Sequence, residues 1–315
     1  MTAPLVSVIM PARNAEKTVG YAIASVLEQT MNDLELIVVD DASTDATVSV
    51  VEAMDDPRIR LLRSRRNIRY AAARNLGLRY ARGKWAAFLD ADDEWMPERL
   101  ERLLVTAQGR EDCYIADLEV LAVPGPSGRL MRARAPKQLE DERLEDLDLD
   151  AALKLGHDVR PMIPVSAFGR EGVEFPEWGS CGEWTFLLVR LHAQGMQGRL
   201  VRRPGYLYRA QAAHDSSTLL AREELLNVLE ILAADVSIPG ASRQLLSERV
   251  AHAREGLVAA ALRHRDVRSF LRYARRYPRA ALNLPRRALL FAAAKVRAFQ
   301  ATAAVSRGIN PAFRP

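Results

Sequence analysis

Strand-like and helix-like segments alternate along the first hundred residues, and this alternation constrains the fold more than any other feature of the chain. Residues 5–10, 34–39, 59–62 and 85–89 are β-rich runs, and helical stripes of apolar residues lie between them. Alternation at this spacing is typical of a parallel, doubly wound sheet. In such a sheet, ligands bind in the crevice at the carboxyl ends of the strands. Functional side chains are therefore expected just after each strand.

Polar residues do gather at those carboxyl ends. Pro11 stops the first strand, Asp41 follows the second, and the run Asp-Ala-Asp-Asp at residues 90–93 follows the fourth. Three carboxylates within four residues repel one another, and their ionised forms are costly to hold unless a positive charge lies among them. A hard divalent cation that also binds a diphosphate would relieve the repulsion. The alternative is a helix start, capped by one of these aspartates, with Pro97 in the first turn.

The first strand–helix turn separates two kinds of nucleotide-binding protein. A dinucleotide-binding fold, such as that of an NAD-dependent dehydrogenase, needs glycines in this turn so that the pyrophosphate can approach the backbone. Residues 11–16 read Pro-Ala-Arg-Asn-Ala-Glu and contain no glycine. The phosphates must therefore be held in another way, and the carboxylates of residues 90–93 together with a divalent ion offer one.

Composition places the chain in a broad class. A hydrophobic content of 49% and a charged content of 27% are ordinary for a soluble globular protein. The two cysteines fit neither a disulfide framework nor a structural zinc site, so a reducing compartment is expected. The sequence shows no signal-like N-terminus and no run of eighteen apolar residues. We therefore expect a cytoplasmic location.

Charge is distributed unevenly along the chain. Residues 241–315 carry 16 Arg or Lys against 3 acids, a net charge of +13, which leaves −8 for the first 240 residues of a chain at +5. A basic helical tail on an acidic body indicates a polyanionic partner. Nucleic-acid signatures are missing from the sequence, so we expect no nucleic acid and favour an anionic surface at the inner membrane face. Packing or homo-oligomerisation through the leucines of the tail is an equal alternative.

Four segments carry the most specific pattern in the chain. They are Val6–Glu16, Leu36–Asp45, Ala73–Gly77 and Ala81–Asp93. In this order and at this spacing they resemble the opening of family 2 glycosyltransferases, over residues 5–104. Each segment alone is a weak signal, but four in register are specific. Further along, the resemblance is patchy and nearest to bacterial exopolysaccharide transferases of the succinoglycan type.

The resemblance implies a GT-A fold, which is an α/β architecture with a doubly wound, mixed but mainly parallel sheet flanked by helices. It also implies an enzyme that moves a sugar from a UDP-sugar, with Mn²⁺ or Mg²⁺ and with inversion, to a polysaccharide or lipid-linked acceptor. We expect the GT-A domain at residues 1–220, with a nucleotide-sugar half at 1–105 and an acceptor half at 106–220. A helical, basic region is expected at 221–315.

The resemblance assigns residues to the nucleotide. Pro11, Ala12, Arg13 and Asn14 would line the pocket, and Asp41 would accept a hydrogen bond from the uracil N3–H. Many relatives have an aromatic residue where this chain has Arg13, although a guanidinium plane can also stack on a base. The plainer interpretations are that Asn14 is only a turn residue and that Asp41 only caps a turn.

Further residues are assigned to the diphosphate, the sugar and the metal. Arg69 would lie near the diphosphate, unless it is simply one of several surface arginines. Asp92 would face the ribose or the sugar, Asp90 is also expected among the nucleotide-sugar-binding residues, and Asp92 or Asp93 would ligate Mg²⁺ or Mn²⁺. His214 lies in a segment that resembles one that folds over the diphosphate, and it would contact phosphate or metal unless it is only solvated.

The expected catalytic base is the point at which the sequence departs from the family. Inverting transfer needs a group that takes the proton from the acceptor hydroxyl. In the family this is typically the aspartate of a Gly-Glu-Asp-aromatic motif, and an ungapped match puts Trp184 at that position. Glu183, one residue earlier and one methylene longer, is the first candidate for the base. Glu177 or Asp117 is the second. The third outcome is a non-catalytic nucleotide-sugar-binding or scaffold protein of a polysaccharide assembly.

Overall fold

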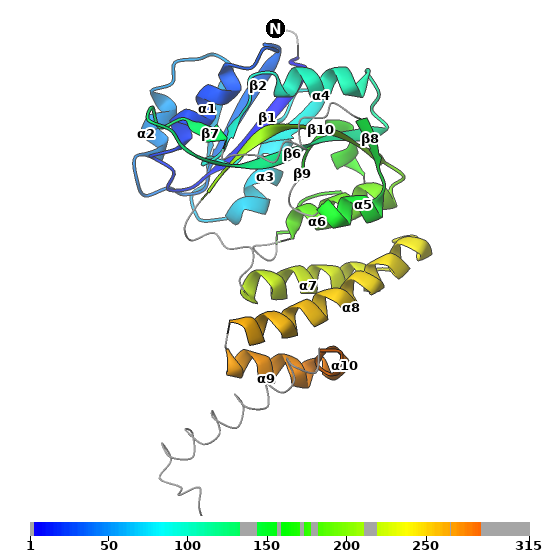
Figure 1. Cartoon of the computed structure of the whole chain (residues 1–315). Coiled ribbons are helices and arrows are strands. Elements are labelled where there is room, and N and C mark those ends of the chain that lie inside the picture. The colour runs from blue at the N-terminus through cyan, green and yellow to red at the C-terminus, as the bar shows by residue number, and fades with distance from the viewer. Residues whose placement is uncertain are drawn as a thin grey trace, which may run out of the picture. The chain divides into compact units, whose positions relative to one another are not determined.

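The computed structural model describes residues 3–132, 144–155, 159–170, 173–177, 182–210, 219–264 and 266–284. The chain divides into two compact units, Met1–His214 and Asp215–Pro315. The first unit contains the sheet and the helices that cover it, and the second unit is helical (Figure 1).

A ten-stranded sheet forms the centre of the first unit, in the order β3-β2-β1-β4-β9-β6-β10-β5, with β7 beside β6 and β8 beside β10. The strands are β1 (Val6–Ala12), β2 (Leu34–Asp40), β3 (Ile59–Arg63), β4 (Trp85–Phe88), β5 (Glu94–Trp95), β6 (Cys113–Pro124), β7 (Leu130–Arg132), β8 (Leu144–Leu147), β9 (Val159–Pro164) and β10 (Gln197–Arg209). The helices are α1 (Val19–Leu27), α2 (Thr47–Glu52), α3 (Arg69–Tyr80), α4 (Arg99–Ala107), α5 (Leu149–Leu155) and α6 (Glu183–Ala193), with a 3₁₀ helix at Val165–Gly169.

The longest ladders of this sheet are parallel. β1 lies between β2 and β4 and is parallel to both, β2 is parallel to β3, and β6 is parallel to β10. β9 joins the two parallel halves because it runs antiparallel to both β4 and β6. The predicted mixed, mainly parallel sheet flanked by helices is confirmed, and all four of the predicted strands form.

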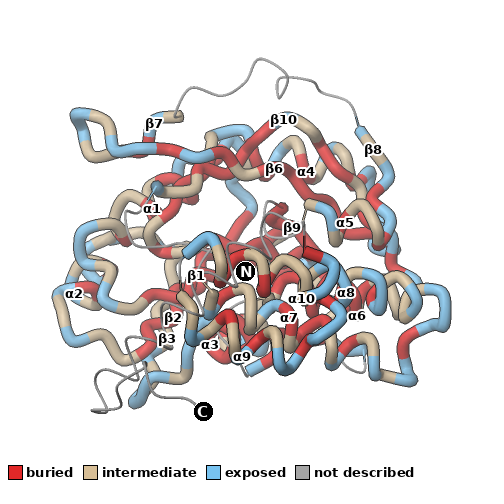
Figure 2. Tube along the Cα trace, turned by 60° about the horizontal axis from the view of Figure 1, so that its bottom comes forward, coloured by how far each residue is buried: buried red, intermediate tan, exposed pale blue. Residues whose placement is uncertain are grey.

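Helices cover both faces of the sheet, so its central strands are buried along their whole length (Figure 2). Val8 and Met10 of β1 pack with α1 and α4 in one apolar cluster, whereas Ile9 packs with α6 in another. Successive side chains of a strand point to opposite faces, which explains why β1 reads as a continuous apolar run. This double cover leaves the carboxyl edge of the sheet as the place for polar side chains.

The second unit consists of α7 (Leu219–Ala234), α8 (Gly240–Arg263), α9 (Val267–Arg276) and α10 (Pro278–Leu282), which confirms the predicted helical C-terminal region. Part of its positive charge is neutralised internally, since Arg254 pairs with Glu230 at 2.8 Å and Arg272 with Glu223 at 3.4 Å. None of the helices in the described ranges is long and apolar enough to cross a bilayer.

Candidate active site

The loops that follow β1 and β2 lie side by side at the carboxyl edge of the sheet. The Asp41 N–H donates to the Ala12 carbonyl at 2.8 Å, and the Arg13 guanidinium donates to the Asp41 carbonyl at 3.0 Å. Pro11 and Ala12 are buried members of β1, so Arg13 is the first partly exposed residue of this edge. The proposed nucleotide-pocket residues 11–13 are therefore adjacent to Asp41.

Asn14 braces the two loops against each other. It has a positive φ of 48°, its N–H donates to Ser43 Oγ at 3.0 Å, and its Oδ1 accepts from the Thr44 N–H at 2.8 Å. Asparagine tolerates this left-handed conformation better than most residues because its side chain bonds locally. The structure thus gives Asn14 a definite turn role, and its contact with a nucleotide stays a prediction.

Asp41 holds the start of α3. Its buried carboxylate accepts from the N–H of Ile68 at 2.5 Å and from the N–H of Arg69 at 2.9 Å. The turn that contains Ser43 is capped by Asp40, whose Oδ1 accepts the Ser43 N–H at 3.2 Å, so Asp41 caps the backbone before α3 and not the turn at Ser43. An ionised carboxylate can accept about four hydrogen bonds, so two bonds to backbone leave capacity for a ligand.

Arg69 is exposed and has a positive φ of 71°. A non-glycine residue held in this region is strained, and such strain collects at functional sites. Here the two amide bonds to Asp41 and a third from the Arg69 N–H to Asn67 Oδ1, at 3.0 Å, hold the conformation. The Arg69 side chain is exposed, and its contact with a diphosphate stays a prediction.

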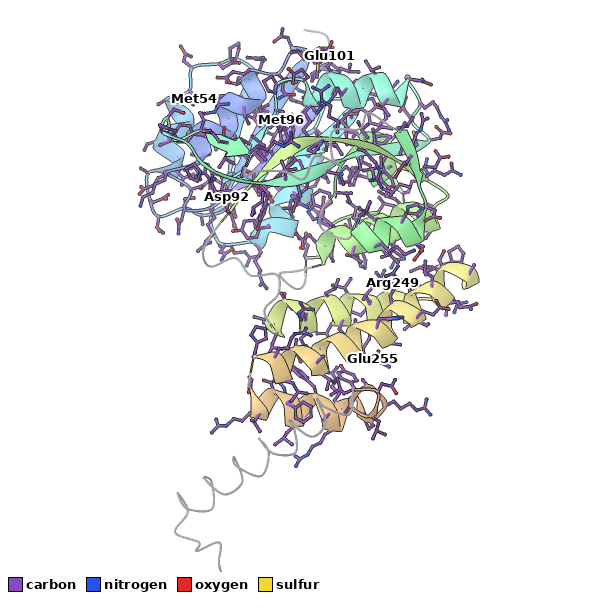
Figure 3. All side chains as sticks on the ribbon, viewed as in Figure 1. Met54, Asp92, Met96, Glu101, Arg249 and Glu255 are labelled. Atoms are coloured by element: carbon purple, nitrogen blue, oxygen red, sulfur yellow. The ribbon has the colours of Figure 1, made fainter. Side chains whose placement is uncertain are left out.

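The aspartates of residues 90–93 form a loop that β10 closes. Tyr206 donates through its hydroxyl to Asp93 Oδ2 at 2.9 Å, and the Arg209 N–H donates to Asp93 Oδ1 at 2.8 Å. Arg209 Nε donates to the carbonyl of Asp92 at 2.7 Å, so Asp92, which is labelled in Figure 3, lies beside the end of β10. The helix that follows, α4, begins only at Arg99 with Glu98 at its N-cap, so the interpretation of these aspartates as helix caps is wrong.

Asp93 is buried among like charges. Burial, followed by the negative charges of Asp92 and Asp90, raises the pKa of the Asp93 carboxyl well above its usual range. A cation placed beside this loop would relieve that repulsion. Magnesium and manganese sites often use only one or two protein carboxylates together with substrate phosphates. Both carboxylate oxygens of Asp93 already accept hydrogen bonds, from Tyr206 and Arg209, whereas Asp92 is partly exposed and is the more accessible of the two for a divalent cation. The described residues contain no cluster of three or more metal-binding side chains, and a metal bound through Asp92 and Asp93 stays a prediction. His214 lies outside the described residues.

Arg74 connects this loop to Glu183. Its Nη2 donates to Asp90 Oδ1 at 2.6 Å and its Nη1 donates to Glu183 Oε1 at 3.1 Å. Glu183 is the first residue of α6 and follows Gly182, whose φ of 86° is in the region that favours glycine. The proposed base is therefore brought to the carboxylate loop, over a sequence separation of about ninety residues.

Trp184 points into the protein. It is 5% exposed, and its ring packs edge-to-face with Phe88 at 5.3 Å and with Phe175 at 5.0 Å between centroids. Glu183, at the first position of the same helix, has a side chain that is 21% exposed. The residue at the position of the family aspartate is a core residue here, and its neighbour Glu183 carries the carboxylate at the site.

The two reserve candidates for the base differ in availability. Asp117 is 1% exposed and accepts two hydrogen bonds from Arg99 Nε and one from Arg99 Nη2, which leaves it no route to an acceptor. Glu177 is exposed, and its Oε1 lies 3.5 Å from Asn75 Nδ2. Asp117 is therefore a structural residue, whereas Glu177 remains open.

Four residues of this site received no site role of their own in the analysis of the sequence. Arg74 was counted among the surface arginines around Arg69, which is wrong because it is 2% exposed. Asn75 was considered only as part of one family-like segment, and Tyr206 and Arg209 only as part of another. The sequence does contain one indication of Arg74 and Asn75, because they are polar residues that directly follow three alanines in a predicted helix. Asn75 exchanges two hydrogen bonds with the backbone of Phe175, at 2.8 and 3.0 Å, and so fixes the segment before α6.

Solved structures with a similar fold exist. One is S. aureus TarS 1-349 in complex with UDP-GlcNAc, with a TM-score of 0.62, 17% identity, and coverage of 98% of this chain and 94% of that one. Another is the mannosyltransferase PcManGT from Pyrobaculum calidifontis in complex with GDP-Man and Mn²⁺, with a TM-score of 0.61, 19% identity, and coverage of 97% and 81%. At these identities the likeness is one of fold.

Sequence comparison identifies the family. The succinoglycan biosynthesis protein ExoO of Rhizobium meliloti (strain 1021) is 33% identical over 228 residues, which cover 69% of this chain and 64% of that protein. The Escherichia coli protein WfgD, named UDP-Glc:alpha-D-GlcNAc-diphosphoundecaprenol beta-1,3-glucosyltransferase, is 48% identical over 97 residues, which cover 31% and 38%. The match thus spans less than two thirds of the length of either relative. Residues 7–160 match the family model described as Glycosyl transferase family 2. The chain therefore carries a family 2 glycosyltransferase domain with the GT-A fold.

Proposed function

We propose that this protein is an inverting glycosyltransferase, which moves a sugar from a UDP-sugar to a hydroxyl of a polysaccharide or lipid-linked saccharide. The observation that carries the proposal is the bridge Asp90–Arg74–Glu183, because it brings a carboxylate able to act as a base to the loop expected to hold the donor. The names of ExoO and WfgD support a saccharide acceptor, and the ligands of TarS and PcManGT support a nucleotide-sugar donor.

Each group of the site has a role in this proposal. Glu183 takes the proton from the acceptor hydroxyl, the oxygen forms a bond to the anomeric carbon, and the bond from that carbon to the diphosphate breaks on the opposite face. Asp41 and residues 11–14 hold the nucleotide, and Arg69 lies near the diphosphate. Asp92 and Asp93, with His214 as a further candidate, would hold Mn²⁺ or Mg²⁺, which when bound supplies positive charge for the departing diphosphate.

A second candidate function is supported by Trp184. With a buried tryptophan at the position of the expected aspartate, the chain could bind a nucleotide sugar without transferring it, as a scaffold of a polysaccharide assembly. The partly exposed Glu183 favours the enzyme over the scaffold, because it offers an acid at the same place.

The test of donor and metal is a thermal-shift panel of nucleotide sugars with and without Mn²⁺, followed by a transfer assay with the ligand that stabilises the protein. A ligand at 100 times its Kd stabilises the folded state by about 2.7 kcal/mol. We expect a UDP-sugar to raise the Tm only when Mn²⁺ is present and then to be consumed. Stabilisation without turnover would favour the scaffold, and stabilisation by nicotinamide nucleotides alone would contradict both functions.

The second unit motivates a further part of the proposal, which is a peripheral location on the cytoplasmic face of an anionic membrane. Arg263, Arg275 and Arg279 are exposed on α8, α9 and α10. Basic side chains near an anionic bilayer contribute roughly 1 kcal/mol each. We expect the protein to sediment with anionic vesicles at low salt and not with neutral ones. Absence of sedimentation, together with a dimer in size-exclusion chromatography, would favour homo-oligomerisation instead.

A further inference from the structure

We infer that Arg74 is a positioning residue of the transfer reaction, which holds the Glu183 carboxylate in place and ties it to the Asp90 loop. The inference rests on the proposed function, since it assigns a role within that reaction. It concerns a buried arginine that acts through its two carboxylate partners.

The first observation is the way in which Arg74 divides its hydrogen bonds. Guanidinium groups commonly grip a single carboxylate with two parallel bonds. Arg74 instead gives one terminal nitrogen to Asp90 and the other to Glu183, at 2.6 and 3.1 Å. One buried cation thereby fixes the distance between the loop after β4 and the first turn of α6.

The second observation is the environment of the guanidinium. Its carbon lies 5.4 Å from the ring centroid of Phe175 and 5.3 Å from that of Trp184, so aromatic faces contribute to holding the charge. Its Nε has no hydrogen-bond partner within the described part of the chain. The Arg74 guanidinium is thus packed against two aromatic rings, and its strongest interactions are with the carboxylates of Asp90 and Glu183.

A comparison with Arg99 shows how a structural ion pair in this protein differs. Arg99 and Asp117 are both 1% exposed, and Arg99 meets Asp117 through Nε and Nη2 together. Arg74 is equally buried, but the side chains of Asp90 and Glu183 are 26% and 21% exposed. Arg74 is therefore a buried cation that pairs with two partly exposed carboxylates, Asp90 and Glu183, whereas Arg99 is buried together with its single partner.

Such an arrangement explains how a glutamate can serve where the family has an aspartate. Glutamate has one more rotatable bond, and its carboxylate at the start of a helix would otherwise sample several rotamers. The bond from Arg74 to Glu183 Oε1 selects one of them. Misplacing a reacting group by about 1 Å can lower a rate by roughly 100-fold.

The experiment is a double-mutant cycle on the transfer reaction of the full-length protein, with Arg74→Met, Glu183→Gln and the double variant. We expect Arg74→Met to lower kcat by roughly 100-fold with the KM for the donor changed by less than about 3-fold. The double variant is expected to be no slower than Glu183→Gln alone, because Arg74 then has no base left to position. Arg58→Met is the control for the loss of an arginine–carboxylate pair elsewhere, since Arg58 forms a 2.8 Å pair with Asp56 in the loop before β3, with side chains 26% and 23% exposed.

Two further measurements separate positioning from folding. If Arg74→Met unfolds, Arg74→Lys keeps the charge, and about 10-fold slower transfer with an unchanged donor KM is expected. Guanidinium ion at millimolar concentration is expected to restore part of the rate of Arg74→Met, but none in the double variant. Additive losses in the cycle, or rescue that persists without Glu183, would overturn the inference while leaving the proposed function intact. Absence of transfer by the wild-type protein would overturn both.

Discussion

Replacing Trp184 with aspartate restores the residue of the family motif, and we expect it to damage the fold without improving transfer. The reason is the direction of the side chain. Trp184 is 5% exposed and packs against Phe88 and Phe175, so a carboxylate at this position would enter the core between two aromatic rings. The restored aspartate would be in the right place in the sequence and the wrong place in space.

The size of the effect follows from the contacts that are lost. Truncation of a buried tryptophan costs about 3–5 kcal/mol. Two edge-to-face ring pairs, each contributing about 0.5–1.5 kcal/mol, place Trp184 toward the upper end of that range. Arg74 and Arg160 lie 5.3 and 5.7 Å from the indole and would offset part of the desolvation of a new carboxylate. A net loss of at least about 3 kcal/mol is expected, out of the 5–15 kcal/mol typical of a folded protein.

The assay is equilibrium unfolding in urea, followed through the midpoint and slope, with transfer activity measured in parallel. Trp184→Phe is the control, because a smaller aromatic ring keeps the core apolar and should lose less than half as much stability. If Trp184→Asp were as stable as the wild type and transferred sugar faster, position 184 would face the acceptor. The assignment of Glu183 as the base would then be refuted.

Three further predictions concern other parts of the site and the core. Asp41→Ala should lower stability by about 1–3 kcal/mol, because two backbone amides at the start of α3 lose their acceptor, and should weaken donor binding in calorimetry. Asp117→Asn should cost about 3–5 kcal/mol in urea unfolding, since it leaves Arg99 buried without its counter-charge; a loss below 1 kcal/mol would contradict this. Burial lowers the pKa of His192 from 6.5 to about 4. The neutral, buried His192 therefore contributes fully to the free energy of unfolding above pH 6.5. This contribution is lost as the pH falls toward 4, by about 3 kcal/mol at most. His192→Gln should flatten that decline in pH-dependent unfolding.

The fold could be predicted from the sequence because local and global signals agree over the first hundred residues. A strand such as β1 is buried on both faces, so it appears as an unbroken apolar run, and polar residues mark its end. The later strands were harder to find. β6 and β10 are long parallel neighbours, and the register of their pairing shifts between Val201 and Tyr206 of β10. Such an irregularity interrupts the alternation of side chains from which a strand is recognised in a sequence.

The candidate site could be predicted only in part. Asp41, Asp92 and Asp93 could be predicted to lie at one edge of the sheet because each follows a strand, and their contacts with donor and metal stay predictions. The role of Arg74 could not be predicted, since its partners Asp90 and Glu183 are brought to it by separate elements. The buried direction of Trp184 likewise depends on packing against Phe88 and Phe175, which no sequence spacing reports.

The measurement that tests the account most directly is the turnover of Glu183→Gln with a UDP-sugar, Mn²⁺ and a saccharide acceptor, beside the wild type. General base catalysis typically contributes about 100-fold to 10,000-fold. We expect a fall in kcat of that size, with donor binding and the Tm close to those of the wild type, because the glutamine keeps the shape of the side chain. Unchanged transfer by Glu183→Gln would contradict the central claim and turn attention to Glu177 as the base.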